Sequence, residues 1–270
     1  MLAEILEWFL TPCPLTARRL GYLNETIAIR ARHRRHRSRW QPHLEATRAF
    51  VERAASATVS KRCATVLGSG PLYDVPLDLL SETFDRVELV DFIHPQEARR
   101  AATQLPNVAL RTEDISGAAA ALAKLPRTAV SPPNLGPPLS FSPETDLVIS
   151  VNLLSQLPEI PYNRLTALTS IPEAVCRNFA ATIVRRHLDM LSGVKCHVAL
   201  ITDVERCYVE TNGIAWPAWG SLYGVELSSG GDTWLWEVAP AGEAHPDLGV
   251  RMTVRAFDDF SRTYGTRAAK

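Results

Sequence analysis

The 270-residue sequence has few cysteines, and none is spaced as a metal ligand or a redox pair. They are odd in number, scattered, and never arranged as Cys-x-x-Cys; the five are Cys13, Cys63, Cys176, Cys196 and Cys207. This usage is typical of free thiols in a reducing compartment and argues against structural zinc. We therefore expect no metal site.

Long apolar runs are also missing. No stretch approaches the roughly 20 apolar residues needed to span a bilayer. The N-terminal segment carries Glu4 and Glu7 where an export signal needs a basic start. The sequence therefore predicts a cytoplasmic protein without a membrane segment.

The net charge of the whole chain is zero, but the charged residues are unevenly distributed along it. Residues 1–62 hold 12 Lys and Arg against 5 Asp and Glu, an excess of +7 that the remainder balances. Six arginines and two histidines fall within Ile29–Arg39. On a helix, Arg30, Arg34 and Arg37 share one face, which suits an anionic partner such as phosphate, RNA or an acidic substrate. Alternatively, this is a solvated helix face that pairs with the acidic remainder; both interpretations stay open.

The most informative stretch is Cys63–Asp91, which predicts a strand, a glycine turn, a helix and a second strand. Ala64–Leu67 is a short apolar run, and the turn that follows consists of Gly68, Ser69 and Gly70. Pro71 suits the first turn of a helix. Asp91 ends the next apolar run, 21 residues after Gly70. An acid about 20 residues after the glycines is typical of folds that bind the ribose of a nucleotide.

One position disfavours a nicotinamide cofactor. Tyr73 stands where the dinucleotide fingerprint has its third glycine, which permits close packing of the phosphate-binding helix. The sequence also lacks a Tyr-x-x-x-Lys pair typical of one class of reductases.

Polar residues follow three further predicted strands. Asp114 follows the strand at 108–111, Asn152 follows the buried strand at 146–151, and Asp203 ends the strand at 197–203. Side chains at the carboxyl ends of parallel strands face the ligand crevice. Asp114 also suits an N-cap of the alanine-rich helix that follows, and Asn152 suits a turn.

The remaining chain completes an α/β pattern. The segment 126–143 holds six prolines and predicts a surface insertion. In two final segments, 233–238 and 251–257, the residue types alternate along the chain as they do in antiparallel strands. We expect a helical extension or cap over residues 1–60 and an α/β domain over 61–270.

Two residues are candidates for acid–base chemistry: Asp203, and His187 in the predicted helix 172–192. His43 is a third, weaker choice. A histidine at position 187 is also compatible with a surface or core location.

These motifs resemble the class I S-adenosylmethionine-dependent methyltransferase family over roughly residues 60–258. The segments that carry the likeness are VLGSGPLYD, ELVD, TEDIS, DLVISVNLLSQLP and LITD. The resemblance implies a Rossmann-like fold, mostly parallel with antiparallel C-terminal strands, and S-adenosylmethionine as the cofactor. It implies these cofactor-binding residues: Gly68, Ser69, Gly70, Asp91, Phe92, Asp114, Ile115, Asn152 and Leu153.

The methyl acceptor is expected to be a small molecule. Two alternatives remain: a nucleic-acid methyltransferase that docks through Arg30–Arg39, and a non-catalytic protein that uses the fold for assembly. The sequence does not indicate an oligomeric state.

Overall fold

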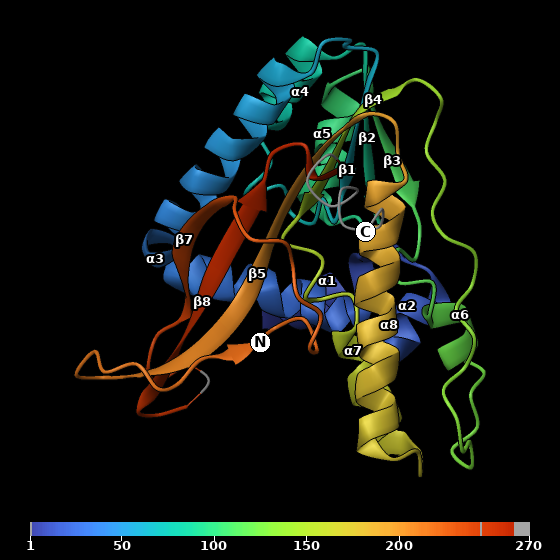
Figure 1. Ribbon diagram of the computed structural model, residues 1–270, viewed down its shortest axis with the longest axis vertical. Coiled ribbons are helices and arrows are strands. Elements are labelled where there is room, and N and C mark those ends of the chain that lie inside the picture. The colour runs from blue at the N-terminus through green and yellow to red at the C-terminus, as the bar shows by residue number, and fades with distance from the viewer. Residues whose placement is uncertain (1, 244, 262–270) are drawn as a thin grey trace.

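Figure 1 shows the computed structural model of the protein, which describes residues 2–243 and 245–261. Its centre is a sheet of eight strands. The strands are β1 (Cys63–Leu67), β2 (Arg86–Asp91), β3 (Val108–Thr112), β4 (Thr145–Val151), β5 (His197–Glu210), β6 (Trp219–Gly220), β7 (Asp232–Ala239) and β8 (Leu248–Phe257). The helices are α1 (Leu2–Leu10), α2 (Leu15–Leu20), α3 (Tyr22–Ala57), α4 (Leu77–Thr83), α5 (Gln96–Gln104), α6 (Ala119–Leu122), α7 (Glu159–Leu168) and α8 (Glu173–Ser192).

The strand order is β3-β2-β1-β4-β5-β8-β7, with β6 paired to β5. Strands β1 to β5 are parallel, and β8 runs antiparallel between β5 and β7. The expected fold class, a Rossmann-like, mostly parallel sheet with antiparallel C-terminal strands, is therefore confirmed. The order reverses between β1 and β4, and in such sheets ligands bind outside the carboxyl ends of the strands at this point.

Helices cover both faces of the sheet, because successive strand residues alternate between two apolar cores. Val66 and Ile149 face the core shared with α3, whereas Leu67 and Val148 face the core shared with α8. In the view of Figure 1, α3 lies to the left of the strands and α8 to the right. Strands buried on both faces explain the continuous apolar runs of β1 and β4.

The N-terminal basic region and the segment after it both belong to α3, in which two helical stretches meet at a kink. Its backbone leaves helical geometry at His36, and it continues through Pro42. The second half packs into the main core through Trp40, Leu44 and Phe50. The helical extension predicted over residues 1–60 thus contributes directly to the core beneath the sheet.

A helix starting at Pro71 was also expected, and this expectation was wrong. Residues 71–76 form turns and bends, and α4 begins only at Leu77. Leu72 has a φ of +64°, which is outside helical geometry. Tyr73 instead stacks on His33 of α3, with ring centroids 3.7 Å apart.

The proline-rich segment 126–143 has no regular structure and runs along the outer edge of the sheet (Figure 1). The side chain of Arg111 in edge strand β3 donates to the carbonyl oxygen of Ser140 at 2.8 Å. Leu139 and Phe141 pack against the α8 core. In the described part of the chain, no helix combines the length and apolar character that crossing a membrane requires.

Candidate functional site

A cavity of about 450 Å³ lies at the carboxyl ends of the parallel strands, where the strand order reverses. Its lining includes every residue that the sequence predicted for the cofactor: Gly68, Ser69, Gly70, Asp91, Phe92, Asp114, Ile115, Asn152 and Leu153. Helix α3 adds another wall through Ile29, Trp40, His43 and Leu44. Cavities of roughly 300–1,000 Å³ are typical of small-molecule and cofactor sites.

The glycine turn and Asp91 are joined by hydrogen bonds. The amide of Gly70 donates to Asp91 Oδ2 at 2.8 Å, and the amide of Phe92 donates to Oδ1 at 2.7 Å. Burial raises the pKa of Asp91, and these amides oppose the rise because they stabilise the carboxylate. A carboxylate has about four acceptor positions, so Asp91 retains capacity for a ligand hydroxyl.

Glycine is required at position 68 for two reasons. Its φ of +75° lies in the left-handed region, and a Cβ there would lie 2.9 Å from the Cβ of Leu153. Gly70, with a φ of +48°, has no such neighbour, so a ligand can approach its backbone closely.

Asp114 is not the N-cap of α6, which is Ala118, but its carboxylate binds the amide of the first α6 residue. Its carboxylate accepts from the amide of Ala119 at 2.6 Å and from the amide of Ser116 at 3.1 Å. These bonds fix the loop after β3, which places Ile115 in the cavity wall.

Asn152 directly follows β4, has a φ of +48° and belongs to a buried polar network. Its Nδ2 atom lies 2.7 Å from Asp74 Oδ2 and 3.1 Å from His43 Nε2. The indole N–H of Trp234 donates to His43 Nδ1 at 3.0 Å. The network therefore connects β7, α3, β4 and the loop after the glycine turn.

Donor and acceptor rules assign the protons of this network. Burial lowers the pKa of His43 to about 3, so the ring is neutral at pH 7. An indole N–H only donates, so His43 Nδ1 is the acceptor and Nε2 carries the proton. The Asn152 amide atom facing Nε2 must then be its oxygen, which exchanges the two amide atoms.

This amide assignment has a consequence for Asp74. Its Oδ2 lies 2.7 Å from the same amide atom, so it must carry a proton to donate to that oxygen. Burial raises the pKa of Asp74, in the direction that this assignment needs. We therefore assign Asp74 as a neutral acid and Asn152 as an amide whose NH₂ group is free for a ligand.

Asp203 lines the cavity from β5 and belongs to a charged cluster. It accepts a hydrogen bond from the Ser155 hydroxyl, and Arg206 Nε donates to it at 3.3 Å. Arg206 also pairs with Glu159 at 2.6 Å. Burial raises the pKa of Glu159, and Arg206 opposes the rise.

His187 does not line the cavity. It is 3% exposed in α8, on the sheet face opposite α3, and its Nε2 lies 2.9 Å from the Ser150 hydroxyl. Burial lowers its pKa to about 3. The structure thus places His187 in the core, which is one of the locations compatible with the sequence. We assign no catalytic role to His187.

Five polar atoms of cavity-lining residues are buried and have no hydrogen-bond partner within the described part of the chain. They are the Tyr22 hydroxyl, Arg32 Nε, Ser69 Oγ, the second side-chain amide atom of Asn152, and Trp236 Nε1. Buried polar groups are rarely left unsatisfied, because each costs about 1–3 kcal/mol. A polar ligand that fills the cavity would remove this cost.

Several lining residues were not predicted from the sequence. Trp236 stacks on His43, with centroids 4.1 Å apart, and brings the C-terminal hairpin into the cavity wall. Arg206 and Glu159 were also missed. Arg206 lies three residues after Asp203, a spacing that gives a weak signal for an ion pair.

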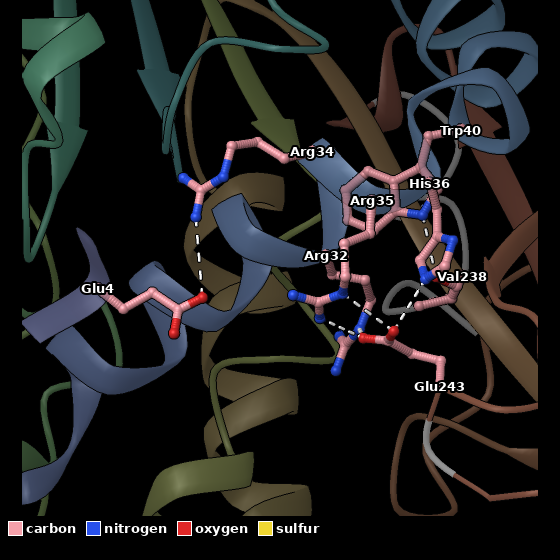
Figure 2. A network of polar contacts seen from close by, with 8 residues as sticks. All are labelled: Glu4, Arg32, Arg34, Arg35, His36, Trp40, Val238 and Glu243. Carbon is pink, nitrogen blue, oxygen red and sulfur yellow. Dashed lines mark hydrogen bonds and ion pairs between the residues drawn. The ribbon is translucent and has the colours of Figure 1, made fainter. Parts of the chain in front are cut away.

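The arginines of α3 are mostly engaged in ion pairs. Figure 2 shows Glu243 facing Arg32, Arg35 and His36, while Arg34 faces Glu4. Three more pairs join this helix to the acidic domain: Arg30 with Glu97, Arg39 with Glu237, and Arg53 with Asp232. This supports the interpretation of the basic run as a face that pairs with the rest of the chain.

No family model and no curated protein sequence matches the chain. Among solved structures, it is similar to DhpI in complex with SAH, with 17% identity, 88% of this chain and 96% of that chain covered, and a TM-score of 0.35. It is similar to an O-methyltransferase family protein from Burkholderia thailandensis, with 14% identity, 75% and 50% covered, and a TM-score of 0.37. It is also similar to the 23S rRNA methyltransferase ErmE, with 11% identity, 77% and 67% covered, and a TM-score of 0.33.

Proposed function

We propose that this protein is an S-adenosylmethionine-dependent methyltransferase that acts on a small-molecule acceptor. The observation that carries the proposal is the contact between the glycine turn and Asp91 in the wall of the cavity. Unpartnered buried atoms on Ser69 and Asn152 fit a polar ligand there. When bound, S-adenosylmethionine supplies an electrophilic methyl group.

The cofactor roles follow the sequence resemblance and the cavity lining. Asp91 would accept hydrogen bonds from ribose hydroxyls, and Phe92 with Ile115 would flank the adenine. The free NH₂ of Asn152 would bind an oxygen of the cofactor or the acceptor. Gly70 would permit close approach of the methionine moiety.

The acceptor would lie toward Asp203 and Arg206. Methyl transfer is an in-line displacement, so positioning and exclusion of water supply much of the rate. Asp203 is the predicted acid–base residue that lines the cavity, and we propose that it accepts a hydrogen bond or a proton from the acceptor. The wall formed by α3 supports a small acceptor over a polymer, because it covers one side of the space beside the strand ends.

Calorimetry with S-adenosylhomocysteine tests the cofactor assignment. We expect the wild-type protein to bind it, and Asp91→Ala to weaken binding by about 1.5–3 kcal/mol, the scale of lost charge-assisted hydrogen bonds. Asp232→Ala is the matched control, since this exposed acid pairs with Arg53 outside the cavity lining. Thermal unfolding of each variant separates loss of binding from loss of fold.

Two results would count against this function. No heat with the wild-type protein would favour the non-catalytic alternative, in which the fold serves assembly. Equal affinity of Asp91→Ala and wild type would place the ligand elsewhere.

A further inference from the structure

A second hollow, of about 520 Å³, lies on the side of α3 that bears the basic run. Its lining combines four arginines and a histidine of α3 with two residues from other elements. The lining residues are Arg30, His33, Arg34, Arg37, Gln41, Leu44, Arg48, Tyr73 and Glu97. The α3 residues recur every three or four positions, so they form one stripe that continues past the irregular backbone at His36.

The charges around this second hollow do not cancel. Arg30 pairs with Glu97 and Glu7, and Arg34 pairs with Glu4. Arg37 has no ion pair within the described residues, and Arg48 donates only to the backbone carbonyl of Tyr73. Two guanidinium groups therefore lack an acidic partner, and the four arginines exceed Glu4, Glu7 and Glu97 by one positive charge.

The positive charge of Arg37 and Arg48 also acts on the neighbouring His33. The pKa of His33 is lowered, first by burial and then by Arg37 and Arg48. Glu97 opposes this effect, and its charge is already engaged by Arg30. The facing groups from packed elements are Glu97 of α5 and the phenol of Tyr73.

Tyr73 and Leu44 line both the second hollow and the main cavity. Tyr73 stacks on His33 with centroids 3.7 Å apart and an interplanar angle of 22°. A ligand group held by Arg37 and Arg48 would therefore sit just across this ring from the main cavity.

We propose that the second hollow is a binding site for the phosphate group of a small molecule. A phosphate monoester carries nearly two negative charges at pH 7, which matches the two unpaired guanidinium groups. Guanidinium groups bind such oxygens through paired, charge-assisted hydrogen bonds. This inference does not depend on cofactor binding, so it can fail or hold separately from the methyltransferase assignment.

Calorimetric titration of the full chain with inorganic phosphate tests the proposal. We expect Arg37→Gln plus Arg48→Gln to weaken phosphate binding by at least about tenfold, because charge-assisted hydrogen bonds are lost. The matched control is Arg39→Gln plus Arg53→Gln, which removes two charges from the same helix outside the second hollow. It should change phosphate affinity by less than about twofold, because screened surface charges act weakly at a distance.

Arg37→Gln alone serves as a variant that should fold normally, because Arg37 is exposed and has no ion pair in the described chain. This variant should unfold at the wild-type temperature and still bind phosphate severalfold more weakly. Butyl phosphate separates two sources of the phosphate. Tighter binding of butyl phosphate than of inorganic phosphate, lost in Leu44→Ala, would indicate a group carried by a molecule that reaches the main cavity. Equal binding would indicate a free ligand of the second hollow.

The proposal is overturned if the wild type binds no phosphate, or if the control pair loses as much affinity as the Arg37 and Arg48 pair. It is also overturned if a short single-stranded RNA binds through these arginines while inorganic phosphate does not, because the site would then be part of a nucleic-acid surface.

Discussion

Replacing Asp74 by asparagine tests the protonation that the buried network requires. The amide has nearly the shape of the neutral acid and can donate an N–H to the same Asn152 oxygen. If Asp74 is neutral in the folded protein, Asp74→Asn preserves the hydrogen bond. If Asp74 is ionised, the substitution replaces a charge-assisted hydrogen bond by a neutral one, at a cost of about 1 kcal/mol.

The sign of the pH dependence follows from the raised pKa of Asp74. The folded protein keeps this proton where the unfolded chain, with a pKa of about 3.9, releases it. The stabilising contribution is therefore complete below about pH 4 and is lost as the pH rises toward the folded-state pKa. Each unit of pKa elevation removes about 1.4 kcal/mol of stability above that value.

The measurement is urea unfolding of wild type and Asp74→Asn between pH 4 and 8, followed by circular dichroism. We expect Asp74→Asn to be more stable than wild type at pH 7 and equal to it near pH 4. Asp146→Asn is a control of opposite sign, because the bond from Arg62 lowers the pKa of Asp146 to about 2. It should lose stability at pH 7. A loss of stability at pH 7 in Asp74→Asn as well would refute the assigned network.

Two further substitutions test how the cavity walls are built. In a thermal scan, Gly68→Ala should destabilise the protein by about 1–3 kcal/mol, because a left-handed backbone and contact with Leu153 both oppose a Cβ. Gly213→Ala is the control. It should cost less in the same scan, because φ is +89° there but nothing lies within 4 Å of the added Cβ. Trp40→Ala should cost about 3–5 kcal/mol in chemical unfolding, because Trp40 is 3% exposed and donates to the Val238 carbonyl at 2.9 Å (Figure 2). A cost near zero for Trp40→Ala would show that α3 is not part of the main core.

The sequence predicted the strand ends of the cavity because their signals are local. An apolar run followed at once by Asp91 or Asn152 marks the point where a buried strand ends. The expected strand end at Asp203 was wrong, because β5 continues to Glu210 and pairs with β8 beyond Asp203. The glycine turn is also a local signal, because Gly68 and Gly70 both have positive φ, which glycine adopts readily. In a parallel sheet these ends meet at one edge, so local patterns were enough to gather the site.

The parts that were not predicted depend on contacts between distant segments. A helix at Pro71 was expected from proline at a helical start, but Tyr73 packs on His33 of α3 instead. The continuity of α3 through Pro42 is stabilised by the burial of Leu44 and Phe50 against the sheet. The partner of His187 is Ser150, a polar residue inside an apolar strand, which was the available hint of a buried pair.

The order in which the chain emerges from the ribosome differs from the order in which the cavity closes. Arg35 and its partner Glu243 are 208 residues apart, and Trp234 meets His43 across 191 residues. Helix α3 is synthesised early, yet Glu237, Glu243 and the indoles that flank His43 arrive with the last hairpin. A nascent chain therefore lacks these contacts until synthesis is nearly complete, and a truncation just before β7 would leave the cavity without one of its walls.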